Sequence, residues 1–357
     1  MDQRGGALIG QPAIDRARAI FAAAFAIIAL AAFSSAVLVA EPVSAKASAR
    51  AEAQTISLRE MSWLAEAGQL IALTREPDVS TDRLVEIASA DGLPAPYRNH
   101  AAFEDDVRVG AALFKTPLLL GGQAAKLEMS CHSCHSSGRT NPRFLFPAIS
   151  REPGTADTTH SFFSKTLGNG VFDPLPIPDL TQNGRINHDL ATGELEAFLE
   201  TLVVDEFGGA QPDARAIRAL ATYVRALRAF GQAETPSIRA RTASRDWDEA
   251  RAMVALAQSR ADNGQRRIAS LLLAGARSRL ALIHERLMPA IHEQERGWLE
   301  AQSRALGKAQ EQLKREVSPS ALLLAEWSSG LKTTPDFARL NATSLYDPAI
   351  LAKRGIE

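Results

Sequence analysis

The pentapeptide CHSCH, residues 131–135, is the feature that most constrains what this chain can fold into. It contains both cysteines of a 357-residue chain and two of its seven histidines. On a helix, residues three and four positions apart lie on one face. Cys131, Cys134 and His135 would therefore face the same object, and the chain has no other cysteine to pair with either thiol.

The spacing C-x-x-C-H is the attachment signature of a c-type haem. Cys131 and Cys134 would bond to the two vinyl groups of one porphyrin, and His135 would supply the proximal nitrogen ligand to the iron. Because the chain has one such motif, we expect one haem c per chain.

Other uses of a cysteine pair explain the motif less completely. A thioredoxin-like dithiol requires a βαβ context, which the surrounding sequence lacks. A tetrahedral zinc site needs four converging ligands, whereas Cys131, His132, Cys134 and His135 are nearly contiguous. A disulfide within the motif leaves His135 without a role. His132 occupies a spacer position, so we expect a surface residue or one that supports the site from behind.

The composition fits a folded chain with no preference for nucleic acid. Hydrophobic residues make up 46% of the chain and charged residues 23%, a balance typical of globular proteins. The 40 basic and 41 acidic residues leave a net charge of −1, so no strong basic field is available to attract nucleic acid. The abundance of alanine favours helices over a β-sandwich.

The N-terminal segment indicates export. A basic stretch precedes an apolar run over residues 19–40, and small residues follow the run. This order predicts a signal peptide over residues 1–47. The run is also long enough to span a bilayer, so a membrane anchor through residues 19–40 is the alternative. We therefore expect a periplasmic or otherwise exported protein, anchored in the inner membrane in the second case.

We expect a mainly α fold in which a helical haem domain spans residues 51–236. The composition changes over residues 136–193, where Gly, Pro, Asn and Asp are frequent. A long irregular stretch of this kind inside a folded domain usually surrounds a ligand or carries a functional site. Helical patterns flank it at residues 56–73, 81–90, 104–114, 193–205 and 213–230.

Residues 244–317 are almost free of proline and predict two or three long amphipathic helices, as a hairpin or a small bundle. We expect this region to dock partners or to mediate homo- or hetero-oligomerisation, and residues 318–357 to form a mixed tail. Leu280, Ile283, Leu287 and Ile291 form one apolar stripe. Core or solvated positions, rather than ligand roles, are expected for Met253, His284 and His292.

The ligand on the second axial face of the iron is the least constrained part of the site. Electron-transfer haems usually take Met or His there. No methionine occurs between residues 136 and 252, and Met129 is too close to the motif to fold over the ring. His160 lies in the irregular stretch and is our first choice. The alternatives are Lys165, an open position, and a His160 that is only a surface loop residue.

Residues 105–138, DDVRVGAALFKTPLLLGGQAAKLEMSCHSCHSSG, resemble the first haem segment of bacterial di-haem cytochrome c peroxidases. The stretches GELEAFLETLVVDEFGG and ALATYVRALRAF are similar to helices that close the haem domains of that family. The resemblance covers residues 104–230 and implies a cytochrome c-like haem domain with His135 as the proximal ligand. Family members carry two haems, whereas this chain has one motif, so it resembles a single-haem relative.

These observations favour an exported mono-haem cytochrome c that transfers electrons between redox partner proteins. One alternative is a peroxidase-like oxidoreductase with an open distal site, for which His160, His188 or Glu128 would have to act as acid or base. The other is a haem-bearing sensor or assembly protein in which residues 244–317 transmit a change of state. Whether the chain is an enzyme is therefore left open, with electron transfer favoured.

Overall fold

The computed structural model describes residues 75–94, 96–182, 184, 186–315, 327–328, 330 and 333–354. The predicted signal peptide or anchor at residues 1–47 and the predicted helix at 56–73 lie outside these residues. No helix within the described ranges is both long enough and apolar enough to cross a membrane.

The fold is mainly helical, as predicted, with 58% of the described residues in helices and 5% in strands. The strands form three separate antiparallel pairs. They are β1 (Arg75–Pro77) with β6 (Ile238–Ala240), β2 (His135–Ser136) with β3 (Arg139–Thr140), and β4 (Thr155–Ala156) with β5 (Leu175–Pro176). Helices therefore carry the core, and the strand pairs fix the course of loops.

Helices α5 (Thr81–Ala88), α6 (His100–Phe114) and α11 (Ala214–Ala233) pack together and confirm three predicted helices. Side chains cap their first turns: Ser80, Asn99 and Asp213 each accept a hydrogen bond from a backbone N–H of the first turn. The apolar face of α11 is buried and consists of Ile217, Leu220, Val224, Leu227 and Phe230.

The crossing of α6 and α11 depends on a glycine. A Cβ added at Gly110 would lie 2.1 Å from the carbonyl oxygen of Ala219 and 2.6 Å from the Cβ of Tyr223. Both distances are far below van der Waals contact, so only glycine permits the two helices to approach this closely.

Short helices connect α6 to the motif: α7 (Pro117–Leu120), α8 (Gly122–Lys126) and α9 (Cys131–Cys134). The described residues between 136 and 189 then form short strands, bends and turns without a helix, in agreement with the irregular stretch predicted at 136–193. The helix predicted at 193–205 is present but changes form along its length. It consists of the 3₁₀ turn η3 (Leu190–Thr192), α10 (Glu194–Thr201) and the π-helical turn η4 (Leu202–Glu206).

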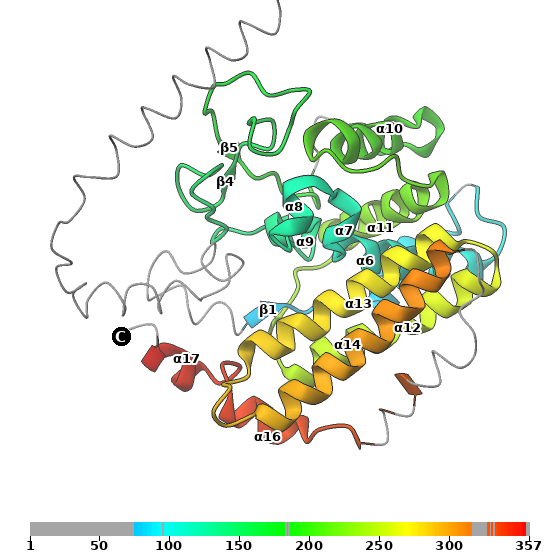
Figure 1. Cartoon of the computed structure of the whole chain (residues 1–357). Coiled ribbons are helices and arrows are strands. Elements are labelled where there is room, and N and C mark those ends of the chain that lie inside the picture. Colours follow the sequence, from blue (N-terminus) through cyan, green and yellow to red (C-terminus); the bar gives the residue numbers. More distant parts are fainter. Residues whose placement is uncertain are drawn as a thin grey trace, which may run out of the picture. The chain divides into compact units, whose positions relative to one another are not determined.

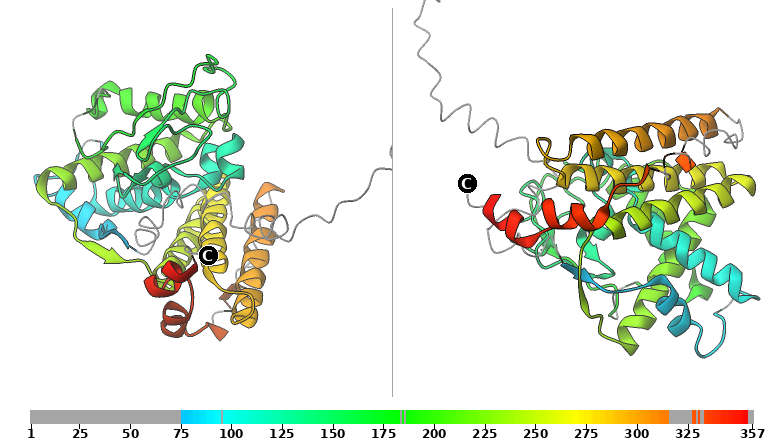
Figure 2. Two further views of the ribbon diagram at one scale, coloured as in Figure 1. Left: turned by 90° about the vertical axis from the view of Figure 1, so that its left-hand side faces the viewer. Right: turned by 90° about the horizontal axis from the view of Figure 1, so that it is seen from below.

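The region predicted as two or three long helices contains three, α12 (Ala243–Asp262), α13 (Arg266–Arg286) and α14 (Glu293–Lys314). They lie side by side in chain order, in yellow to orange, in both further views (Figure 2). Residues 318–357, expected to be a mixed tail, include the two short helices α16 (Phe337–Thr343) and α17 (Pro348–Arg354).

One position of the predicted stripe is wrong. Leu280, Ile283 and Leu287 are buried, but Ile291 is 57% exposed. Helix α13 ends at Arg286, so the helical spacing that would align Ile291 with the stripe does not continue to it. Met253 and His292 are buried, and His284 is 3.1 Å from Glu300 through Nε2.

The described residues all belong to one compact unit. Helices α12 and α13 contact α6, and α13 also contacts α7, so the long helices pack against two elements that precede the motif (Figure 1). The hydrophobic core is continuous across them and includes Leu113, Leu220, Leu272 and Leu306. The separate haem domain at 51–236 and the docking role of 244–317 stay predictions.

Candidate functional site

The first four residues of the CHSCH motif, Cys131–Cys134, form the helical turn α9. The backbone N–H of His135 donates to the carbonyl of Cys131, but His135 has a non-helical backbone conformation and is the first residue of β2. The Ser133 hydroxyl accepts a hydrogen bond of 3.1 Å from the N–H of Ser130 and fixes the start of the turn. Both thiols therefore belong to α9, and the imidazole belongs to the residue that directly follows it.

Both cysteines are free thiols and are partly accessible. Burial raises the pKa of Cys131 to about 12, and burial followed by the neighbouring Cys131 raises the pKa of Cys134 to about 12. Thiols of a redox dithiol need a lowered pKa, because the thiolate is the reactive form. The surroundings of this pair therefore do not favour thiol–disulfide exchange.

His135 is held in the tautomer that leaves Nε2 as the unprotonated nitrogen. Its Nδ1 lies 3.0 Å from the carbonyl oxygen of Pro178. A carbonyl can only accept, so Nδ1 carries the hydrogen and donates it. Burial lowers the pKa of His135 to about 4, so the ring is neutral near pH 7 and Nε2 keeps its lone pair. No hydrogen bond within the described residues uses that lone pair.

The backbone around the motif fixes the carbonyl of Pro178 in place. Leu180 donates through its N–H to the carbonyl of Gly138 at 2.9 Å, and the Thr140 hydroxyl donates to the carbonyl of Ile177 at 2.8 Å. These bonds tie residues 177–180 to the turn between β2 and β3. Gly138 has φ of +82° and lies against Leu227 of α11, so the turn requires glycine.

His160 makes different hydrogen bonds from His135. Its Nδ1 accepts from the N–H of Phe162 at 3.2 Å, and its ring lies edge-on to Phe172 at 6.1 Å between centroids. Neither contact reaches residues 131–135. Since Nδ1 is the acceptor, the neutral ring carries its hydrogen on Nε2. Coordination of iron through Nε2 would require the other tautomer, and the role of His160 as the distal ligand stays a prediction.

The other candidates for the second axial face are dispersed. Lys165 is exposed. Burial, together with Arg228 and Arg225, lowers the pKa of His188, and its Nδ1 is buried without a hydrogen bond. Glu128 accepts a hydrogen bond of 2.7 Å from the Ser278 hydroxyl in α13.

The loop that carries His160 exposes an unusual number of large apolar side chains. Leu167, Val171, Phe172 and Leu175 are 42%, 54%, 41% and 66% exposed. They precede Pro178, whose carbonyl orients His135. Exposed apolar side chains that gather on one segment usually mark a surface that a ligand or partner covers.

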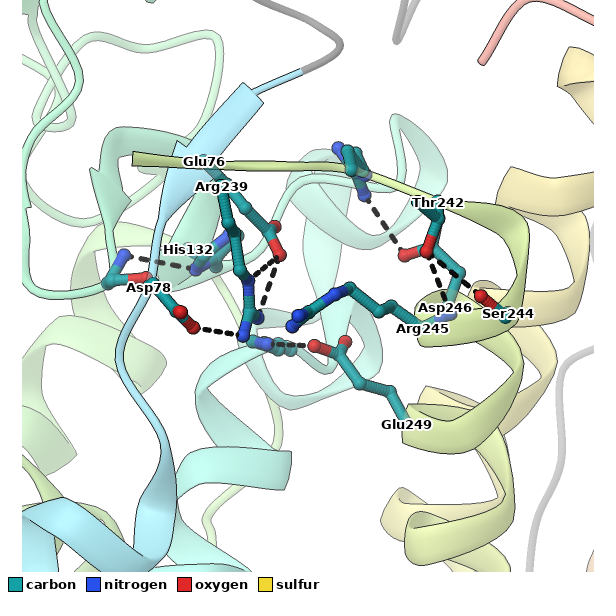
Figure 3. A network of polar contacts seen from close by, with 12 residues as sticks. Glu76, Asp78, His132, Arg239, Thr242, Ser244, Arg245, Asp246 and Glu249 are labelled. Atoms are coloured by element: carbon teal, nitrogen blue, oxygen red, sulfur yellow. Dashed lines mark hydrogen bonds and ion pairs between the residues drawn. The ribbon is translucent and has the colours of Figure 1, made fainter. Parts of the chain in front are cut away.

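His132 supports the site from behind, which is one of the two roles expected for it. Its Nδ1 accepts from the N–H of Ser137 at 3.3 Å, and its ring lies edge-on to Phe114 of α6 at 6.5 Å. Burial lowers the pKa of His132 well below its usual value, and Lys115 lowers it further. Figure 3 shows His132 in the same network of polar contacts as residues from α12.

Charged residues from four segments of the chain make up that network. Lys115 lies 2.5 Å from Glu249 of α12, and Arg279 of α13 lies 3.7 Å from Glu249. Asp246 of α12 is 3.4 Å from Arg241 and accepts a hydrogen bond of 2.6 Å from Tyr346. This cluster was not predicted from the sequence. The pattern that could have indicated it is the acidic pair Asp246 and Glu249, three residues apart on an otherwise apolar face of α12.

Among the described residues, no group of three or more His, Cys, Asp or Glu side chains could hold a metal ion. Comparison with known protein families, with curated proteins and with solved structures finds no match to this chain.

Proposed function

We propose that this chain is an exported mono-haem c-type cytochrome that transfers single electrons between redox partners. Cys131 and Cys134 would hold the haem covalently, and His135 would be its proximal iron ligand. The observation that carries the proposal is the hydrogen bond from His135 Nδ1 to Pro178, which leaves Nε2 free to ligate. A hydrogen bond of this kind fixes the tautomer of a metal-bound histidine and raises its basicity.

The donor set fits a haem better than the other groups considered. Two protonated thiols on α9 and one neutral imidazole on the next residue match two thioether bonds and one axial ligand. A bound haem supplies an iron that accepts or releases one electron. The chain's own residues do the rest: Pro178 orients the imidazole, and the apolar side chains of the 167–175 loop would exclude water from the ring.

The fold and location that we propose follow from the same site. The paired helices α6 and α11, with α9 beside them, would be the framework of a cytochrome c-like haem domain. Thioether bonds to a c-type haem form after export, in agreement with the signal peptide or anchor predicted for residues 1–47. The partners would be proteins that donate and accept single electrons.

A peroxidase-like oxidoreductase with an open distal position is the second candidate, and one observation favours it. Because Nδ1 of His160 accepts from the backbone, its Nε2 carries a hydrogen and could donate to a bound ligand rather than coordinate iron. A haem-bearing sensor or assembly protein is the third candidate, and no contact in the described residues speaks for it specifically.

A redox titration followed by visible absorbance separates the first two candidates. An electron-transfer protein should follow a reversible one-electron curve and show a low-spin ferric spectrum. Rapid mixing with hydrogen peroxide should produce no higher-valent species. A high-spin ferric spectrum, with fast formation of an oxidised intermediate, would contradict the electron-transfer proposal and favour the peroxidase-like function. The matched variant His160→Ala reports whether that side chain is the sixth ligand.

A further inference from the structure

A largely buried ion pair, Lys115 with Glu249, lies between α6 and α12 near the CHSCH motif. Attachment of a haem does not by itself require this pair. Lys115 ends α6, Glu249 belongs to α12, and their Nζ and Oε1 atoms are 2.5 Å apart. Their side chains are only 18% and 24% exposed. Removing two charges from water is costly, and an apolar pair of similar size often stabilises a fold equally well. A role beyond stability is therefore a reasonable hypothesis for this pair.

The pair lies near α9, because Lys115 follows Phe114, whose ring centroid is 6.5 Å from that of His132 in α9 and 5.3 Å from that of Tyr223. After burial, Lys115 is the largest influence on the pKa of His132, which it lowers, and Glu249 opposes that effect. Tyr223 of α11 is buried, and its pKa is raised by burial, then by Glu249 and then by Cys131. The Tyr223 ring therefore lies within electrostatic reach of both the ion pair and a thiol of the motif.

The long helices bring Glu249 to this position. Ser278 of α13 donates to Glu128, three residues before Cys131. A Cβ on Gly275 of α13 would lie 2.3 Å from the hydroxyl oxygen of Thr116. These close contacts hold α12 and α13 against the segment that enters the motif, so the charges near α9 have fixed positions.

We propose that the Lys115–Glu249 pair sets the reduction potential of the haem that α9 would carry, with Lys115 raising the potential and Glu249 lowering it. This inference rests on the proposed haem attachment. Reduction adds one electron, supplied by a redox mediator, and takes the iron from ferric to ferrous without making or breaking a bond. A nearby positive charge favours the added electron, and a nearby negative charge opposes it.

The size of the effect follows from Coulomb's law. A unit charge that acts on an iron through partly solvated surroundings, where the effective dielectric constant is high, changes the ferrous-to-ferric ratio roughly threefold. At about 59 mV per tenfold change for one electron, that ratio corresponds to about 28 mV. Salt screens partly buried charges weakly, so the effect should persist at moderate ionic strength.

Removing one charge at a time should leave the fold intact. In Lys115→Gln, Glu249 still has Arg279 at 3.7 Å. In Glu249→Gln, the partly exposed Lys115 can turn toward water. Neither change strands a fully buried charge, which is the usual reason that breaking such a pair unfolds a protein. Lys115→Arg keeps the charge and is the conservative control.

The test is a potentiometric titration of the full chain carrying covalent haem. Glu249→Gln should raise the potential and Lys115→Gln should lower it, each by about a threefold change in the ferrous-to-ferric ratio. Lys115→Arg should restore the wild-type value. The exposed pair Glu311 and Lys314, 2.7 Å apart near the end of α14, provides matched controls, and its single glutamine variants should leave the potential unchanged.

A structural role predicts a different pattern. Loosening the site would move both variants in the same direction, because each would admit water to the haem. Shifts of the same sign, or shifts no larger than those of the Glu311 and Lys314 variants, would overturn the inference and leave the proposed function standing. A wild-type protein without covalent haem would overturn both.

Discussion

The close crossing of α6 and α11 gives a direct test of the fold, the substitution Gly110→Ala. In an isolated helix this change should stabilise by about 1 kcal/mol, because alanine forms helices better than glycine. Here the new methyl group would lie 2.1 Å from the Ala219 carbonyl oxygen and 2.6 Å from the Tyr223 Cβ. Overpacking of this kind costs about 3 kcal/mol at its upper end. The net expectation is a loss of about 2 kcal/mol in the free energy of unfolding.

Urea unfolding of the wild type and two variants measures this difference. With an m-value of about 3 kcal/mol/M, a loss of ~2 kcal/mol lowers the unfolding midpoint by about 0.7 M. The matched control is Gly297→Ala in α14, where a Cβ would meet nothing within 4 Å. That variant should gain about 0.5–1 kcal/mol. If Gly110→Ala gains stability as the control does, the close crossing of α6 and α11 is refuted.

Three further predictions concern the long helices and the charges that they bury. Leu280→Ala should cost about 2–5 kcal/mol and Ile291→Ala less than about 0.5 kcal/mol in urea unfolding, because the first side chain is buried and the second is 57% exposed. Tyr346→Phe removes a buried hydrogen bond to Asp246 and should cost about 1–3 kcal/mol by the same assay; no loss would show the bond to be unimportant. Burial raises the pKa of Glu249, but Lys115 and Arg279 outweigh it and lower that pKa to about 2. The stability that Glu249 contributes should therefore be complete above about pH 4.5 and decline as the pH falls toward 2, and Glu249→Gln should flatten the curve over that range.

Local patterns predicted much of the helical structure. The apolar positions of α11 recur at helical spacing, and the Asp213 carboxylate caps its first turn. The C-x-x-C spacing placed Cys131 and Cys134 on one helical turn, because that relation depends only on neighbours in the chain, whereas His135 lies just after the helix, at the start of β2. The predicted apolar stripe is wrong at Ile291, because helical spacing carries no information about where a helix ends.

Contacts between distant segments could not be predicted from the sequence. Pro178 lies 43 residues after His135, and the loop bonds of Gly138 and Thr140 decide that its carbonyl meets Nδ1. Lys115 and Glu249 are 134 positions apart. Each looks like an ordinary surface charge in the sequence, and only the packing of α12 and α13 against α6 buries them together.

The measurement that tests the central claim most directly is the intact mass of the protein exported in a host that attaches c-type haems. The account predicts the mass of the polypeptide plus one haem, retained after denaturation, with both thiols blocked to alkylation. Cys131→Ser with Cys134→Ser should abolish the added mass. A wild-type mass equal to the polypeptide alone, with two thiols open to alkylation, would contradict the account.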